Sequence, residues 1–448
     1  MELDAPGPAG GGPAGTGPAP ARGWPSRRTV CVLLLLAAAA LAFNFWIGVL
    51  SSTYDDLNSG IGVPQHDFFQ YYAGGHNWRL GLDPYLNHPG DGLAIQHPRH
   101  DDPTISGFIY PPTVLPLMGL LARADYETAR AAWLALDAVC FALLVLCAVL
   151  VSRGRRLEVF TACVLLTVAS WGFIYHVHEG QIDMIVAALA VSGFLLYPRW
   201  KGWPSAALLA VAVAIKVSPV LLVLVVALYF RDWRFLLKTL ACGAALVAVS
   251  FVWVDVSLYR EYVTHILPAI AGSDPSPYNQ TPLRFWSRYP ALVKAGSALG
   301  YAALLFLAWL AGRNTRRLPQ AERRVDQATE RLAVLLLAVL LMLLFSPLAW
   351  QMAYVWVVAP LALLLVAPAP DGRRGIVLAL GAAAALLLLR MWPYRVLDMT
   401  NIIGAALGAL LVIRYYLPLG TRRLPAPGPG APPAPLAGGR TTPDGEAL

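Results

Sequence analysis

Runs of apolar residues alternate with short polar connectors along most of the chain. The first run extends from Thr29 to Leu50, and further runs recur from Phe108 as far as Tyr416. A run of about 20 apolar residues is long enough to cross the hydrocarbon core of a bilayer as a helix. The pattern therefore predicts an all-α fold, a polytopic transmembrane bundle of about 11–13 apolar segments.

The two ends of the chain, residues 1–28 and 424–448, are rich in Pro and Gly. Such segments cannot bury enough apolar surface to fold, so we expect disordered tails around a multi-spanning domain at residues 29–423. The run Thr29–Leu50 could instead be a signal peptide. Its full-span length and the lack of a clean small-residue cleavage site before Tyr54 favour a retained first helix.

The composition agrees with a membrane protein, since 57% of the residues are hydrophobic and 13% are charged. A soluble domain carries roughly 25% charged residues, so lipid must be the main solvent of this chain. The formal net charge of +8 comes from short basic clusters between apolar runs, which is typical of cytoplasmic loops and not of a nucleic-acid-binding face. These clusters are Arg153–Arg156, Arg199–Lys201, Arg231–Arg234, Arg313–Arg324, Arg373-Arg374 and Arg422-Arg423.

Placing the basic clusters in the cytoplasm puts both termini inside and two polar stretches, residues 51–107 and 255–293, outside. The connectors alternate between the inside and the outside everywhere except at one point. Phe108–Leu121 and Thr128–Val151 separate an outer loop from the cluster at Arg153, where only an odd number of crossings fits. Either Phe108–Leu121 is a short re-entrant piece or that basic loop breaks the rule, and the sequence leaves both open.

An acidic residue on the first outer loop is a candidate catalytic group. Asp67 follows His66 and precedes the aromatic-rich segment Phe68-Phe69-Gln70-Tyr71-Tyr72. Partial desolvation by the aromatic rings would raise the pKa of the Asp67 carboxyl toward the range of a general base. An Asp before an apolar run is also a common helix N-cap, so both interpretations are kept.

A lysine interrupts the apolar pattern in the middle of the chain. Lys216 lies between Pro204–Ile215 and Pro219–Phe230, two runs that are too short to be ordinary spans. Broken helices at membrane depth are typical of segments that line a cavity, where the ammonium could bind a lipid phosphate. Snorkelling to ordinary headgroups is the alternative, and the break on both sides favours the phosphate.

The segment from His176 to Asp183 contains His178, Glu179 and Gln181 as further polar side chains. Histidines at positions i and i+2 do not share a helix face, and no third ligand is evident. We therefore expect this segment to hydrogen-bond sugar hydroxyls, not to bind a metal.

The second outer loop carries Asn279, Gln280, Arg284 and Arg288. Amide and guanidinium groups suit a sugar and a phosphate. A loop that is simply solvated by polar residues explains the same composition, and both interpretations stay open.

Signatures of other chemistries are absent from the sequence. It has no Walker-type P-loop, no Asp-x-Asp pair for a nucleotide sugar, and no Gly-x-Ser-x-Gly elbow. The five cysteines lie in apolar segments without metal-type spacing, which argues against a disulfide framework. We expect no metal site and no cofactor, and leave a divalent-metal requirement open.

Seven short stretches, in this order, resemble the GT-C class of membrane glycosyltransferases, and within that class glycosyltransferase family 87. They are distributed from residue 66 to residue 350, a region of about two thirds of the chain. The stretches are His66-Asp67-Phe68-Phe69-Gln70-Tyr71-Tyr72-Ala73, Gly81-Leu82-Asp83-Pro84-Tyr85, Tyr110-Pro111-Pro112, Gly180-Gln181-Ile182-Asp183, Ile215-Lys216-Val217-Ser218-Pro219, Asn279-Gln280-Thr281 and Ser346-Pro347-Leu348-Ala349-Trp350.

The resemblance implies a GT-C-like bundle that transfers a hexose, by analogy mannose, from a polyprenyl-phosphate carrier. Asp67 would be the general base that takes the proton of the acceptor hydroxyl, and inversion at the anomeric carbon would follow. Lys216, with Arg288 or Arg284, would stabilise the leaving phosphate. One base suffices for a single displacement, whereas hydrolytic glycosidases pair two carboxylates.

We expect the acceptor to be a lipid-linked or cell-envelope glycan, with no nucleic-acid partner. The protein would lie in the plasma membrane with its site on the extracytoplasmic face and both termini in the cytoplasm. The residues expected to bind the sugar and the acceptor are His66, Tyr71, Tyr72, His178, Glu179, Gln181, Asp183, Asn279, Gln280 and Trp350.

The chain departs from the family pattern after Trp350. The family often continues with an acidic residue and histidines, but here Gln351-Met352-Ala353-Tyr354 follows. A histidine contribution is therefore missing at that point, or it comes from His66, His176 or His178.

Two other functions are compatible with part of the pattern. A transporter or flippase of a lipid-linked glycan would explain the many spans and the cationic outer groups, but not two long polar outer loops, and transporters place their key groups nearer the midplane. A non-catalytic scaffold for envelope assembly predicts that Asp67→Asn leaves function intact.

Overall fold

The computed structural model describes residues 66–86, 108–152, 154–168, 170–200, 202–270, 279–319, 325–367 and 400–417, with three short pieces between 376 and 384. The predicted first helix, most of the first polar loop and both predicted tails lie outside the described residues. The described part consists of helices and their connections, with an isolated β-bridge between Asn279 and Trp350. The predicted all-α class is confirmed.

Four described helices are each long and apolar enough to cross a bilayer. They are α4 (Tyr126–Val151), α10 (Trp233–Ser250), α13 (Pro290–Arg317) and α14 (Gln327–Phe345). The pair α5 (Arg156–Val168) and α6 (Trp171–Glu179) is bent by 65° at a short break and could supply one further crossing. The chain is therefore a multi-pass membrane protein.

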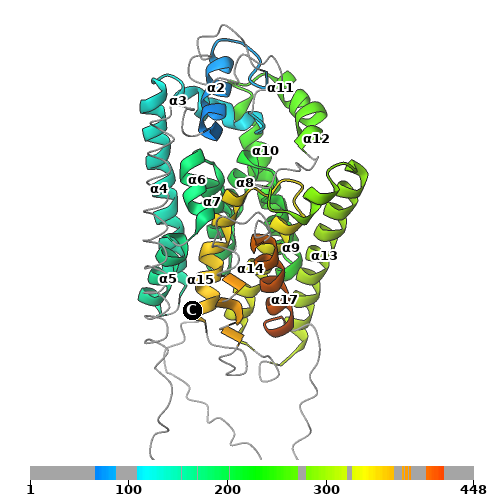
Figure 1. The fold of residues 1–448 in the computed structure, drawn as a ribbon. Helices are drawn as coiled ribbons and strands as arrows, with labels where there is room; N and C mark the ends of the chain where they lie inside the picture. The colour runs from blue at the N-terminus through cyan, green and yellow to red at the C-terminus, as the bar shows by residue number, and fades with distance from the viewer. Residues whose placement is uncertain are drawn as a thin grey trace, which may run out of the picture.

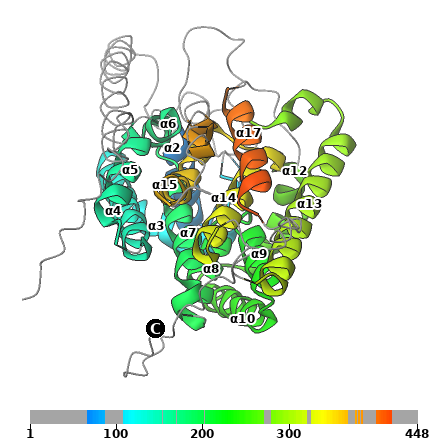
Figure 2. The ribbon, with the colours of Figure 1, turned by 90° about the horizontal axis from the view of Figure 1, so that it is seen from below.

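Shorter helices pack around α14, which forms the centre of the bundle (Figure 2). They are α7 (Asp183–Trp200), α9 (Val220–Phe230), α15 (Val358–Val366) and α17 (Thr400–Tyr415), while α8 (Trp203–Ile215) packs against α7 and α10. In α14, 78% of the apolar window is buried inside the protein, compared with 17–28% in α4, α10 and α13. The three outer helices therefore lie at the periphery of the bundle.

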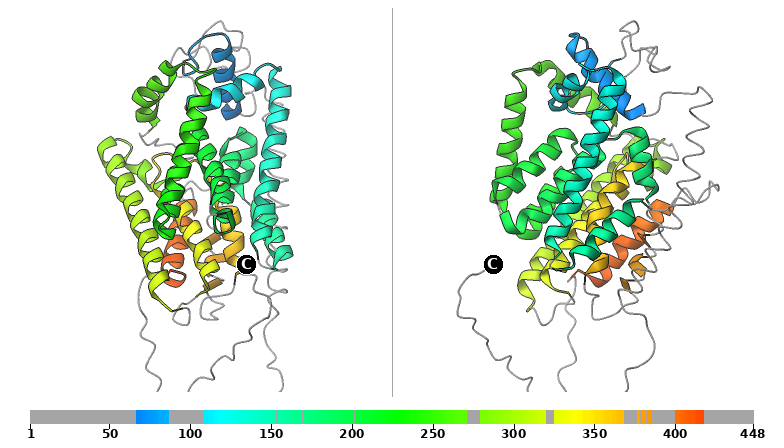
Figure 3. Two further views of the ribbon diagram at one scale, coloured as in Figure 1. Left: turned by 180° about the vertical axis from the view of Figure 1, so that it is seen from behind. Right: turned by 90° about the vertical axis from the view of Figure 1, so that its left-hand side faces the viewer.

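Short elements form a layer over one end of this bundle, as Figures 1 and 3 show for α2, α3, α11 and α12. Apart from η4 (Pro282–Trp286) and η6 (Gln351–Val357), which contact α14, the short elements are those of this layer: α2 (His66–Arg79), η2 (Pro112–Val114), α3 (Leu115–Leu121), α11 (Val256–Glu261), the π-helical turn η3 (Tyr262–Ile266) and α12 (Leu267–Ile270). They come from the two polar stretches of the sequence and from the connections next to them.

The apolar piece Phe108–Leu121 does not cross the bundle. Its helix α3 has seven residues, about 10 Å of helix, and packs against α2. A Cβ on Gly75 of α2 would lie 2.3 Å from the backbone of Met118, so the two helices are in direct backbone contact. Of the two explanations for the failed alternation, the short non-spanning piece is therefore the one that fits, and α4 makes the crossing alone.

Aspartates fix the starts of three long helices. The carboxylate of Asp125 accepts the backbone N–H of Thr128 at the start of α4. Asp232 caps α10 and Asp326 caps α14 in the same way. Such a cap satisfies a backbone donor that the helix leaves unpaired, and each is worth about 1 kcal/mol.

The helix break predicted around Lys216 is present. Helix α8 ends at Ile215, Lys216 has extended backbone angles (φ −144°, ψ 132°), and α9 begins at Val220. The lysine therefore lies in a short irregular connection between two apolar helices, and the direction of its side chain is not set by a helix.

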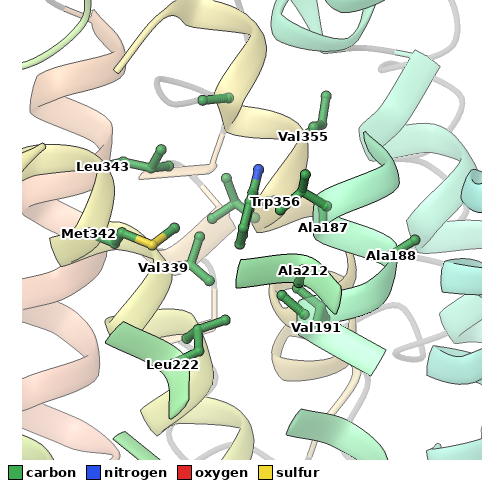
Figure 4. Packing of buried hydrophobic residues seen from close by; sticks show 14 of the residues in the cluster. Ala187, Ala188, Val191, Ala212, Leu222, Val339, Met342, Leu343, Val355 and Trp356 are labelled. Atoms are coloured by element: carbon green, nitrogen blue, oxygen red, sulfur yellow. The ribbon is translucent and has the colours of Figure 1, made fainter. Parts of the chain in front are cut away.

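The apolar core lies next to this break, where side chains of α7, α8, α9 and α14 meet those of η6. Figure 4 shows Trp356 of η6 surrounded by neighbours that include Ala187, Ala212 and Val339. Trp356 is 1% exposed, and an aromatic side chain of this size dominates the packing around it. The core thus holds η6 in place against α7.

Gly312 of α13 provides a test of this packing. A Cβ at this position would lie 2.1 Å from the carbonyl oxygen of Tyr229 in α9, and a backbone atom cannot move aside as a flexible side chain can. We expect Gly312→Ala to lower the free energy of unfolding by about 1–3 kcal/mol, as overpacked core substitutions do. The thermal unfolding midpoint of the purified protein in detergent measures this effect.

Gly243→Ala is the matched control. Gly243 lies within α10, and a Cβ there would meet no atom within 4 Å. Because Ala favours helix over Gly by about 1 kcal/mol, this variant should be as stable as the wild type or slightly more stable. Equal losses in the two variants would contradict the proposed α9–α13 contact.

Candidate active site

Asp67 lies in the first turn of α2, whose aromatic face packs against the start of α4. The ring of Phe68 lies 5.6 Å from that of Tyr126 and 5.7 Å from that of Trp133. The ring of Tyr71 lies 5.5 Å from that of Trp133. Phe68 and Tyr71 are three positions apart, so they share one helix face and fix the rotation of α2.

A chain of hydrogen bonds connects Asp67 to the turn between α6 and α7. Gln181 donates from Nε2 to Oδ2 of Asp67, and its Oε1 accepts the hydroxyl of Tyr71 at 3.0 Å. Since the hydroxyl proton of Tyr71 is used in this way, the Tyr110 hydroxyl, 3.0 Å away, is the donor to Tyr71. The two tyrosines therefore orient the Gln181 amide so that its N–H faces the carboxylate.

The α6–α7 turn has a geometry that only glycine adopts easily. Gly180 has φ 65°, and its N–H donates to the carbonyl of Val177 while the N–H of Gln181 donates to that of His176. This is the Schellman arrangement that commonly ends a helix. The indole N–H of Trp133 donates to the Gly180 carbonyl at 2.7 Å, so α4 holds both α2 and this turn.

A buried pair lies behind the turn. His176 Nε2 donates to Asp137 Oδ2 of α4 at 2.8 Å, and the two residues are 0% and 6% exposed. His176 was expected to belong to a polar corner that binds sugar, but the structure directs its side chain into the bundle. Asp137 was not identified from the sequence. A single acid within an apolar span was the signal that could have identified it.

The electrostatic surroundings of Asp67 suit proton transfer near neutral pH. Burial, and after it the negative charge of Glu179, raises the pKa of Asp67 to about 7. The hydrogen bond from Gln181 and the charge of Lys216 act in the opposite direction and limit the shift. A carboxyl with this pKa is divided between its acidic and basic forms at physiological pH, as a general base requires.

Lys216 is fixed by an ion pair within the same electrostatic neighbourhood as Asp67. Its Nζ lies 2.8 and 3.0 Å from the two carboxylate oxygens of Asp183, which begins α7. Trp356 Nε1 donates to Oδ1 of Asp183 at 3.0 Å. Asp183 is 3% exposed, whereas the Lys216 side chain is 31% exposed, so the cation is the member of the pair that a ligand can reach.

The segments at 279–281 and 346–350, which the sequence places far apart, pair with each other. Asn279 accepts the N–H of Ala349 at 2.9 Å and donates to the carbonyl of Pro347 at 3.1 Å. The N–H of Gln280 donates to the carbonyl of Ala349 at 2.7 Å, and the Gln280 carbonyl accepts the Tyr354 hydroxyl. Both segments end in irregular backbone, and these bonds satisfy its polar groups.

Asn279, Gln280 and Trp350 were expected to bind sugar. The side chain of Asn279 bonds to the backbone of the facing segment, and Trp350 pairs with Asn279 through the isolated bridge. Asn279 and Gln280 are fully buried. The structure therefore gives Asn279 and Trp350 a role in holding this connection, and a role in sugar binding stays a prediction for all three.

The two arginines of the second outer loop differ in position. Arg284 is 8% exposed, donates from Nη1 to the carbonyl of Asn279 at 3.1 Å, and lies over the ring of Phe285. Arg288 is exposed, directly before the start of α13. Arg284 is thus the one held close to the 279–281 segment.

The remaining predicted residues lie at the edge of the site. Tyr72 donates its hydroxyl to the carbonyl of Ala124, on the side of α2 that faces the start of α4. His178 lies 3.3 Å from Glu179 and stacks against the ring of Tyr175. The side chain of His66 is outside the described part of the structure. In all, Asp67, Tyr71, Gln181, Asp183 and Lys216 are brought together with Glu179.

A membrane bundle that holds an acid, an oriented amide and a cation under an outer layer of helices has the features of an integral membrane group-transfer enzyme. The model of glycosyltransferase family 87 matches residues 108–347, more than half of the chain. The protein belongs to this family, and it is a membrane glycosyltransferase.

A curated relative extends the likeness over most of the chain. The sequence is 26% identical, over 403 residues, to a Mycobacterium tuberculosis protein named polyprenol-phosphate-mannose-dependent alpha-(1-2)-phosphatidylinositol mannoside mannosyltransferase. The matched region covers 81% of this chain and 82% of the relative. The likeness therefore extends over more of the chain than the residues matched by the family model.

The buried His176–Asp137 pair generates a stability prediction. Asp137→Ala leaves the His176 N–H buried without its acceptor, and a buried unsatisfied polar group costs about 1–3 kcal/mol. We expect the thermal unfolding midpoint in detergent to fall accordingly. The double variant Asp137→Leu with His176→Phe removes both polar groups, so it should lose less stability than the sum of the two single variants. Strict additivity would show that the pair makes no direct interaction.

Proposed function

We propose that the protein transfers a mannosyl residue from a polyprenyl-phosphate-mannose donor to a lipid-linked or cell-envelope glycan, with inversion at the anomeric carbon. The donor is supported by the name of the mycobacterial relative and by the family. The observation that carries the mechanism is the placement of Asp67 and Lys216, a base and a cation, in one electrostatic neighbourhood. The acceptor is assigned only by class, because the chain departs from the family pattern after Trp350.

In this proposal Asp67 activates the acceptor. Its Oδ2 is held by Gln181, so Oδ1 faces the acceptor hydroxyl and takes its proton as that oxygen attacks the anomeric carbon. The bond between the anomeric carbon and the phosphate oxygen breaks on the opposite face, and the electron pair leaves with the polyprenyl phosphate. A β-linked donor gives an α-linked product.

Lys216 stabilises the departing phosphate. As negative charge accumulates on the leaving oxygen, an ammonium fixed in advance stabilises it more than a mobile one would. Asp183 and Trp356 provide this fixation, so we assign Asp183 to positioning Lys216. Arg284 or Arg288 is the second cation of the proposal.

The first test is the loss of the base. We expect Asp67→Asn to reduce sugar transfer from radiolabelled polyprenyl-phosphate-mannose to membrane lipid acceptors by about 10²–10⁴-fold, the range of general-base contributions. Asp83→Asn, on the connection after α2, is the control and should keep wild-type activity. Equal transfer by Asp67→Asn and wild type would remove Asp67 from the mechanism. Absence of transfer by the wild type would contradict the donor.

The pH dependence tests the same residue independently. Because the raised pKa keeps Asp67 protonated below about pH 7, we expect kcat/KM to fall tenfold per pH unit below that value and to level off above it. Glu179→Gln removes a neighbouring negative charge, so the carboxylate of Asp67 becomes easier to form. The acidic limb should then move to lower pH. A limb that stays in place or moves upward would exclude Glu179 as a neighbour that controls the base.

A further inference from the structure

Arginines gather at the end of the bundle that is remote from the candidate site. Helix α9 leads away from Lys216 and ends at Phe230, and α7 leads away from Asp183 and ends at Trp200. The last turn of α13 and the first turn of α14 meet the end of α9 there. Figure 1 shows α13 extending from the layer side to this opposite end.

Three guanidinium groups converge on the last residues of α9. Arg316 of α13 donates to the carbonyl of Tyr229 at 2.9 Å. Arg331 of α14 lies over the ring of Phe230, 5.5 Å from its centroid. Arg231 follows directly in the chain, and its charge is close enough to act on that of Arg316. These three residues, Arg231, Arg316 and Arg331, are called the arginine cluster below.

The nearby carboxylates are engaged elsewhere. Asp232 accepts the Tyr197 hydroxyl at 2.7 Å and caps α10. Glu330 is 1% exposed and accepts the hydroxyls of Tyr229, at 2.8 Å, and Thr315. Within the described part of the chain, no member of the arginine cluster forms a salt bridge. Among the residues that the structure describes, the positive charge of the cluster is therefore not paired by a carboxylate.

The backbone at Arg231 is a second, independent observation. Arg231 has φ 55°, and it is the single residue other than glycine with a positive φ among the described residues. Glycine is the usual residue at such a helix end, because a Cβ makes the left-handed conformation costly. An arginine kept in a strained position points to a function of its side chain.

Exposed tryptophans mark the level of the lipid headgroups at this end. Trp200, Trp203 and Trp233 lie at the end of α7 and the starts of α8 and α10, and they are 48%, 56% and 54% exposed. Tryptophan is enriched at the boundary between hydrocarbon and headgroups. The arginine cluster lies next to the same helix ends, so its ligands come from the headgroup layer.

We propose that the arginine cluster is a binding site for the phosphate of an anionic phospholipid. A guanidinium binds phosphate oxygens through two parallel N–H donors, and a basic pocket between helix ends is a known form of headgroup site. The lipid phosphate supplies the negative charge that the described carboxylates do not provide. The occupied site stabilises the junction of α9, α13 and α14.

The experiment compares purified full-length protein with added phosphatidylglycerol or phosphatidylcholine in detergent micelles. We expect phosphatidylglycerol to raise the thermal unfolding midpoint by several degrees and phosphatidylcholine to leave it unchanged. Arg231→Gly should lose at least half of this rise. Because glycine relieves the backbone strain at this position, the variant should unfold in phosphatidylcholine no earlier than the wild type, so loss of the lipid effect is not loss of folding.

Arg231→Gln with Arg316→Gln should abolish the rise. Arg260→Gln with Lys294→Gln is the charge-matched control, since both residues are exposed and lie near the opposite end of the bundle. The control should keep the full rise. The proposal is overturned if the wild type shows no difference between the two lipids, if the cluster variants keep the rise, or if inorganic phosphate at millimolar concentration produces the same rise.

Discussion

A lysine ammonium cannot remain inside a helical membrane bundle without a negative partner, and Lys216 has one in Asp183. A buried carboxylate such as that of Asp183 costs several kcal/mol when it is left unpaired, so the pair determines where its neighbours lie. Asp183 begins α7, where the dipole of the helix favours a negative charge, and Lys216 occupies the break between α8 and α9. Trp356 of η6 donates its indole N–H to Asp183, and its buried ring belongs to the apolar core, so the core lies directly beside the ion pair.

The same constraint explains why the irregular segments of the chain meet at one level. Backbone groups outside helices have no water to bond with in a membrane, and such segments persist only where protein groups satisfy them. The indole N–H of Trp133 donates to the carbonyl of Gly180, and the side-chain oxygen of Asn279 accepts the N–H of Ala349. The site is therefore built from the connections between helices. The hydrogen bonds that satisfy the backbone of these connections also position Asp67 and Lys216.

The sequence predicted well what depends on hydrophobic pattern and on short motifs. The helical class and the broken helix at Lys216 both came from such local signals. What it missed depends on pairing across the bundle. Asp137 sits in an apolar helix and acquires its partner only when α4 packs beside α6. The contacts of Asn279 with the segment near Ala349 could not be predicted either, because the two segments are about 70 residues apart in the sequence and meet only in the fold.

Helix α9 ties the two ends of the bundle together. It follows Lys216 after three residues and ends at Phe230, next to the arginine cluster, over about 16 Å of continuous helix. Gly312 of α13 packs against the last turn of α9, where a Cβ on Gly312 would overlap the backbone of Tyr229. Helix α9 therefore joins the residues around Tyr229 to the connection that carries Lys216, and the exposed Arg231 follows directly at its end.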